Sequence, residues 1–216
     1  MKVVAFVPIK LNSERVPLKN IRAFKNGKPL IEYILNTLKE VGGIDKIYVY
    51  CSNKDIQKYL PSGVNFLQRD CYYDLSSTPF NEVLSGFAKE VHADTYVLAH
   101  ATAPFMKKES IETAISKVID GEYDSALTVT EFKEFVWKNG KPFNYDINNI
   151  PRTQDLEPMY IETCGLYVYK KNLIIDENRR IGDKPFLVEI SKIEACDINV
   201  EEDFIIAEAI FHSITE

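Results

Sequence analysis

The apolar positions of the chain form short continuous runs and helical stripes that follow one another in turn. The first run, Val3 to Ile9, is rich in β-branched and aromatic residues, which is typical of a strand buried on both faces of a parallel sheet. From Leu30 to Val41, apolar residues recur at helical spacing, with Pro29 suited to the first turn and Gly42 to the end. A strand at 46–51, a helix that Ser52-Asn53 caps and that runs to residue 60, and a strand at 64–67 complete this part.

The alternation continues to the C-terminus with one interruption. The elements expected are a helix capped by Thr78 with Pro79 at its first position, a strand at 95–99, a helix at 111–119, strands at 125–130 and 163–169, and a helix at 201–214. This order predicts an α/β fold with a doubly wound, mostly parallel sheet. The polar stretch from Glu131 to Met159 breaks the rhythm and contains the turn signal Gly140-Lys141-Pro142. We therefore expect an inserted hairpin or arm at 131–162, which serves a binding site or a contact between subunits.

Composition limits the class of protein. The 216 residues are 45% hydrophobic and 27% charged, which fits a single domain over 1–216 with its own core. The net charge of 26 − 32 = −6 gives no general attraction to nucleic acid or anionic lipid, so neither is expected as a partner. No stretch approaches the ~20 apolar residues of a membrane span, and the first apolar run is short for a signal peptide, so we expect a cytoplasmic protein. The four cysteines are scattered and indicate neither a zinc site nor a disulfide framework.

The loop after the first strand carries the first candidate chemistry. Lys10, Arg15 and Lys19 place three cations within ten residues, at the carboxyl end of a strand, where ligands bind in open α/β sheets. Cations combined with backbone amides suit a triphosphate. The loop lacks the glycines and the G-K-[ST] ending of a Walker A motif, and it is not a dinucleotide fingerprint. An ordinary solvated loop is the alternative interpretation.

Three motifs in the same order resemble one family. VPIKLNSERVPLKNI at 7–21, followed by NGKPL at 26–30, resembles the signature loop of the acylneuraminate (CMP-sialic acid synthetase-like) cytidylyltransferases, commonly written A-R-x-x-S-K-x-x-P-x-K-N. HATAPF at 100–105 lies where that family has Q-P-T-S-P-L, and CDINV at 196–200 lies where it has D-I-D. The resemblance covers nearly the whole chain and implies a Rossmann-like nucleotidyltransferase fold. It also implies transfer of CMP from CTP to a sugar acid, such as a sialic-acid-like nonulosonic acid, with release of pyrophosphate.

The resemblance assigns expected roles to individual residues. Around the triphosphate it implies catalytic Lys10, Arg15, Lys19 and Asp197, with Mg²⁺ held by Asp197 and Asn199. The nucleotide contacts implied are Asn12, Ser13, Asn20, Arg69 and Asn81. The acceptor contacts expected are His100, Thr102, Arg152, Gln154, Glu162 and Thr163, with the last four in a region that the family uses partly across a dimer contact. The partners expected are thus CTP, a small acidic acceptor and a second copy of the chain in a homodimer.

Two departures from the family pattern leave alternatives open. Glu14 stands where the family usually has a basic residue, so Arg15 is expected to supply the missing charge. Asn199 replaces the second aspartate of the metal pair, so we expect weaker metal binding or a greater reliance on the nucleotide. The alternatives are a CTP-dependent transferase for a phosphonate or another small acid, and a non-catalytic nucleotide-binding protein with a degenerate site.

Overall fold

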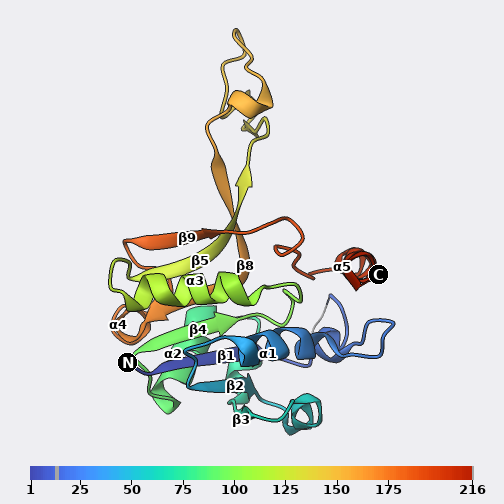
Figure 1. Ribbon diagram of the computed structural model, residues 1–216, viewed down its shortest axis with the longest axis vertical. Helices are drawn as coiled ribbons and strands as arrows, with labels where there is room; N and C mark the ends of the chain where they lie inside the picture. Colours follow the sequence, from blue (N-terminus) through green and yellow to red (C-terminus); the bar gives the residue numbers. More distant parts are fainter. Residues whose placement is uncertain (13–14, 216) are drawn as a thin grey trace.

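In the computed structural model, which describes residues 1–12 and 15–215, the chain folds around a seven-stranded mixed sheet (Figure 1). The strand order is β3-β2-β1-β4-β8-β5-β9. The strands are β1 (Val3–Ile9), β2 (Lys46–Cys51), β3 (Val64–Gln68), β4 (Thr95–Ala99), β5 (Ser125–Phe132), β6 (Trp137–Lys138), β7 (Lys141–Pro142), β8 (Met159–Lys170) and β9 (Pro185–Glu189). The helices are α1 (Leu30–Glu40), α2 (Phe80–Glu90), α3 (Lys108–Ile119), α4 (Lys171–Ile175) and α5 (Glu201–Thr215), with 3₁₀ turns η1 (Lys19–Ile21), η2 (Lys54–Tyr59), η3 (Cys71–Asp74) and η4 (Thr153–Asp155).

The sheet is parallel except at one strand. β1 pairs in parallel with both β2 and β4, and β2 with β3, whereas β8 runs antiparallel between β4 and β5. β9 pairs in parallel with β5 at the far edge. The prediction of a doubly wound, mostly parallel α/β sheet is confirmed.

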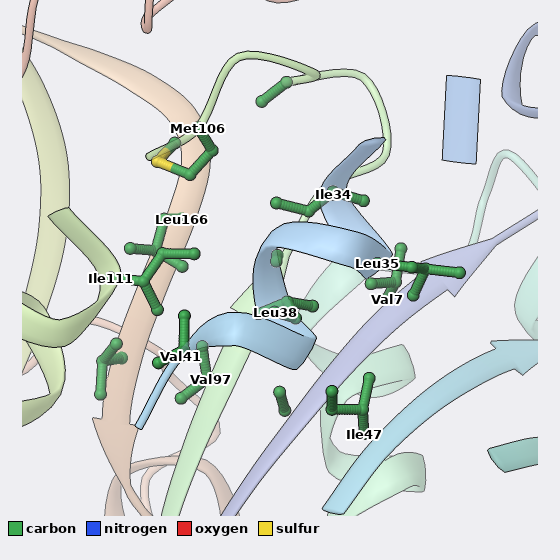
Figure 2. Close-up of a cluster of buried hydrophobic side chains, with 14 of the residues drawn as sticks. Val7, Ile34, Leu35, Leu38, Val41, Ile47, Val97, Met106, Ile111 and Leu166 are labelled. Atoms are coloured by element: carbon green, nitrogen blue, oxygen red, sulfur yellow. The ribbon is translucent and has the colours of Figure 1, made fainter. Parts of the chain in front are cut away.

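Helices cover both faces of the sheet, and the side chains of β1 alternate between them. Val3, Ala5, Val7 and Ile9 pack into the core under α1 and α3, part of which is shown in Figure 2. Val4 and Phe6 point into the opposite core, under α2 and α4, where the ring of Phe6 stacks on that of Phe87 at 4.0 Å between centroids. β1 is therefore buried on both faces, as its continuous apolar run predicts.

A third apolar cluster attaches the C-terminal helix to the rest of the domain. Phe204 and Ala207 of α5 pack with Phe24 and Leu30, and Ile198 lies in the same cluster. This packing fixes the segment just before α5 beside the polypeptide that follows β1. The segment after β1 and the segment before α5, which are far apart in sequence, thus meet at the carboxyl end of the parallel strands.

The stretch between β5 and β8 forms the predicted arm and extends from the body of the protein (Figure 1). Its base continues the main sheet, because Phe132 pairs with Met159 in the β5–β8 ladder. Its distal part contains the small β6–β7 hairpin, which turns at Asn139 and Gly140. Both residues have positive φ, 53° and 74°, as tight two-residue hairpin turns require.

Several local expectations differ from the structure. Residues 54–59 form a 3₁₀ helix rather than an α-helix, although Asn53 caps it as expected by accepting from the Asp55 amide. The helix α2 begins at Phe80, because Pro79 occupies the cap position and the Thr78 hydroxyl instead donates to the Tyr72 carbonyl. The sequence pattern also missed β9 and the short helix α4. Among the residues described, no helix is both long and apolar enough to cross a membrane.

Candidate active site

The carboxyl ends of β1 and β4 lie side by side, and the residues that follow them line one small cavity. Lys10 follows β1, and His100 and Thr102 follow β4. With the loop cations, these side chains enclose about 180 Å³, which we call the basic cavity; its lining is Pro8, Lys10, Arg15, Lys19, Asn20, His100, Ala101 and Thr102. Six expected site residues, Lys10, Arg15, Lys19, Asn20, His100 and Thr102, thus line one cavity.

Lys19 is held in this cavity by an unusual backbone turn. Leu18, just before η1, has a left-handed φ of 54°, which is strained for a residue with a side chain. The turn places Lys19 in a position only 8% exposed, where its Nζ donates to the Ile198 carbonyl oxygen at 2.5 Å. Burial lowers the pKa of Lys19, while the nearby Asp197 carboxylate opposes that shift.

The segment before α5 closes one side of the cavity. The Ile198 amide donates to the Thr102 carbonyl at 2.9 Å, so the segment is bonded to the β4 loop as well as to Lys19. Asp197 is not among the residues that line the basic cavity, but its charge acts on both Lys19 and His100. Lys10 and Lys19 thus line one cavity, and Asp197 lies outside its lining.

Asn199 connects Asp197 to Arg15 of the first loop. Its Nδ2 donates to Asp197 Oδ2 at 2.6 Å, and its Oδ1 accepts from Arg15 Nη2 at 3.3 Å. The amide thereby links Arg15 to Asp197 without a direct ion pair. Glu14 and Ser13, on which two of the loop expectations rest, lie outside the described residues. Asn12 is described and exposed.

The donor set around Asp197 fits one kind of metal site. The described part of the chain contains no group of three or more His, Cys, Asp or Glu side chains placed to hold a metal. Magnesium, however, is usually bound by one or two carboxylates together with substrate phosphates and water. Asp197 alone therefore fits a Mg²⁺ ion shared with a phosphate ligand. Asn199 could join it only by turning its amide oxygen away from Arg15.

A second cavity adjoins the first, because Pro8 and Lys10 line both. It encloses about 280 Å³ between β1, η3 and the start of α2, and Arg69, Tyr73 and Phe80 contribute to its wall. Arg69 is 4% exposed and pairs with Asp74, which also lines this cavity. An enclosed space beside a cluster of cations is suited to the flat, polar base of a nucleotide.

Three expected contacts have other partners in the structure. Asn20 donates from Nδ2 to the Lys10 carbonyl at 3.2 Å, so it ties the two ends of the loop together. Asn81 donates to the Asn178 carbonyl and accepts from Arg180. Thr163 bonds to Thr128 across the bulge between β5 and β8. In the structure these three side chains therefore connect parts of the chain to each other.

The expected acceptor residues of the arm are separated from the cavities within this chain. Arg152 and Gln154 lie in or beside η4 on the projecting arm (Figure 1), and Arg152 pairs with Asp155 there. Glu162 instead lies near the base of the arm, where it accepts from the Tyr167 hydroxyl and faces Arg180 at 3.8 Å. Arg180 was not predicted as a site residue, since nothing in its local sequence pattern distinguishes it from a solvated loop arginine.

Comparison with known proteins identifies the family of this chain. A sequence model of the cytidylyltransferase family matches residues 4–183, which include the loop after β1, both cavities and the arm. The chain belongs to the cytidylyltransferase family.

Individual relatives of this cytidylyltransferase family member are distant. It is 23% identical over 217 residues to the N-acylneuraminate cytidylyltransferase of Streptococcus agalactiae serotype III, strain NEM316, covering 95% of this chain and 52% of the relative. It is 22% identical over 227 residues to the pseudaminic acid cytidylyltransferase of Campylobacter jejuni serotype O:2, covering 98% of this chain and 97% of that protein. The chain thus spans about half the length of the N-acylneuraminate enzymes it matches.

The fold is shared more closely than the sequence. The structure of CMP:2-keto-3-deoxy-manno-octonic acid synthetase complexed with CTP superimposes with a TM-score of 0.75 over 99% of both chains, at 15% identity. This likeness shows that the two chains share one fold.

We predict that the His100 imidazole of this cytidylyltransferase stays neutral at pH values well below those at which histidine ordinarily gains a proton. Burial lowers the pKa of His100 to about 4; the Asp197 charge opposes this shift, and Arg180 and Lys19 add smaller lowering effects. The Nε2 of His100 has no hydrogen-bond partner in the described structure. Because this pKa is below the unfolded value of ~6.5, the unfolded state binds the proton first. The contribution of His100 to stability is therefore full above that value and decreases as the pH falls toward 4.

The measurement is an NMR titration of the imidazole protons of the three histidines. A His100→Gln variant assigns the signal, and its unfolding free energy should depend less on pH between 6.5 and 4. A His100 signal that titrates near 6.5 in the native protein contradicts the prediction.

Proposed function

We propose that the protein is a CTP-dependent cytidylyltransferase that transfers CMP to a nonulosonic sugar acid and releases pyrophosphate. The observation that carries the proposal is the joint placement of Lys10, Arg15 and Lys19 around one cavity, with the Asp197 charge near enough to act on Lys19. Such a site matches the charge of a triphosphate in a chain whose net charge is −6. Family membership and the distant likeness to nonulosonic acid enzymes support the choice of nucleotide and acceptor.

The proposed reaction is an in-line displacement at the α-phosphorus. An acceptor hydroxyl oxygen forms a bond to that phosphorus as the bond to the bridging oxygen of the β-phosphate breaks, and the hydroxyl proton passes to solvent water. Lys10 and Lys19 stabilise the negative charge that develops on the departing pyrophosphate. Asp197 would hold Mg²⁺, which would supply further positive charge when bound. Arg15, held by Asn199, completes the cationic side of the loop.

The remaining expected residues are proposed to contact either the nucleoside part of CTP or the acceptor. The cavity beside Arg69 is proposed to take the cytosine and ribose, with Asn81 holding the start of α2 in place. His100 contacts the acceptor through its unpaired Nε2, and Thr102 lies beside it in the basic cavity. A group with a pKa of about 4 is a weak base, so His100 is proposed to position the acceptor hydroxyl rather than to take its proton.

We also infer that the arm contacts a second copy of the chain. Its exposed apolar side chains, 39–60% exposed, are Phe135, Trp137, Phe143, Ile147 and Ile150. A solvent-facing group of this kind is typical of an interface. In such a homodimer, Arg152 and Gln154 of one arm would reach the acceptor side of the partner's site.

The function is tested by pyrophosphate release and product mass. The purified protein is incubated with CTP, Mg²⁺ and N-acetylneuraminic acid, pseudaminic acid, N,N′-diacetyllegionaminic acid or 2-hydroxyethylphosphonate, with ATP, GTP and UTP as nucleotide controls. We expect a CMP conjugate with at least one of the sugar acids. Turnover with the phosphonate alone would favour the alternative acceptor class, and CTP binding without any turnover would favour a non-catalytic nucleotide-binding protein.

Lys19→Met is predicted to lower kcat/KM about 100- to 1000-fold. Loss of one preorganised charge contact at such a centre typically costs ~3 kcal/mol of transition-state stabilisation. Lys39→Met, which removes an exposed lysine near the end of α1, is the matched control and should be neutral. Steady-state kinetics with saturating acceptor, together with thermal melting of both variants, make the comparison. Near-wild-type kinetics in a folded Lys19→Met variant would place that lysine outside the reaction.

Asp197→Ala is predicted to remove the magnesium dependence of the site. We expect turnover to fall at least about 100-fold and the affinity for CTP, measured by calorimetry with and without Mg²⁺, to lose its dependence on the metal. Glu202→Gln, an exposed acid in the first turn of α5, is the control. A folded Asp197→Ala variant with the same response to Mg²⁺ as the parent protein would assign the metal to other groups.

A further inference from the structure

An arginine outside the predicted set projects into the wall next to His100. Arg180 lies in the loop between α4 and β9, and its guanidinium lies 4.4 Å from the ring centroid of Tyr167 and 5.7 Å from that of Phe80. The same two rings neighbour His100, at 6.4 and 5.6 Å between ring centroids. Because His100 lines the basic cavity, Arg180 is connected to that cavity through one layer of aromatic side chains.

The guanidinium is oriented but incompletely paired. Nη1 donates to Asn81 Oδ1 at 3.2 Å, Nη2 lies 3.5 Å from the Tyr167 hydroxyl, and Glu162 faces Nη2 at 3.8 Å. In the described structure Nε is buried without a hydrogen-bond partner. The side chain is 25% exposed, so a ligand can reach it, while the carboxylate of Glu162 is too distant for a close bidentate pair.

The adjacent arginine provides a direct contrast. Arg179 bonds to Asp183 through two nitrogens, at 2.7 and 3.1 Å, and also pairs with Glu177. Its binding capacity is occupied at the surface by acids of its own loop. Arg180 turns inward, and among the residues that the structure describes no carboxylate lies at hydrogen-bond distance from it.

We propose that Arg180 binds the anionic group of the acceptor and determines the preference for an acid. This inference rests on the proposed function and assigns a residue to its acceptor side. A planar guanidinium held against two aromatic rings is preorganised to receive an oxyanion. Glu162 keeps the guanidinium balanced in the absence of acceptor, and the acceptor anion replaces that distant pairing with direct hydrogen bonds.

The test compares Arg180→Met, Arg180→Lys and the control Arg179→Met. The acceptors are N-acetylneuraminic acid, pseudaminic acid and N,N′-diacetyllegionaminic acid, each as the free acid and as the primary amide, together with 2-hydroxyethylphosphonate. We expect Arg180→Met to raise the KM of the acid about 10- to 100-fold, the range of a hydrogen bond to a charged group. The Kd for CTP should not change. Arg180→Lys should recover part of the loss, and Arg179→Met should behave as the parent protein.

The ratio of kcat/KM for acid and amide separates anion binding from a structural role. The parent protein should prefer the acid, and Arg180→Met should lose that preference, whereas a general loss of structure would affect both acceptors equally. Turnover of a sugar acid with an unchanged ratio in Arg180→Met overturns the role of Arg180 and leaves the proposed function standing. Turnover of the phosphonate alone, lost in Arg180→Met, supports Arg180 but overturns the sugar acid. CTP binding with no turnover of any acceptor overturns both.

Discussion

The burial of the Lys19 ammonium against the segment before α5 is the constraint on which the site depends. A buried lysine needs compensation, and it receives it from the Ile198 carbonyl and from the charge of Asp197. The two sides of this contact are separated by 179 residues and meet only because α5 packs on the polypeptide after β1. The position of α5 therefore determines whether the cations of the first loop face an acid.

Much of the fold is predictable from the sequence because the central strands are buried on both faces. The run at Val3–Ile9 coincides with β1, and the helical stripes coincide with α1, α2 and α3 to within a few residues. β9 is different: it lies at the sheet edge, and its apolar run is short, because Phe186, Leu187 and Val188 stand between a proline and Glu189. The antiparallel direction of β8 is likewise invisible in its residues, because direction depends on where the preceding chain leads.

The candidate site is predictable to the extent that its residues are close in sequence. Lys10, Arg15 and Lys19 share one loop, and a strand end before them indicates where they lie. Arg180 shows the limit of this reasoning. It and Arg179 are adjacent in the acidic loop DENRRIGD, yet one pairs at the surface and the other stacks against Tyr167. Only the tertiary packing of β8 and α2 distinguishes them.

Asn199 and Arg180 have related electrostatic consequences. A second carboxylate at position 199 would sit beside Asp197 and oppose the approach of a triphosphate, whereas the amide donates to Asp197 and accepts from Arg15. The charges that act on Lys19 are those of Arg15, Asp197 and Asp203. An anionic ligand in the basic cavity would meet the three loop cations Lys10, Arg15 and Lys19. Glu162 faces Arg180 from 3.8 Å without closing on it, and both Arg180 and Lys19 lower the pKa of His100. A chain with a net charge of −6 thus places two cations near one buried imidazole, where an anionic ligand would be attracted.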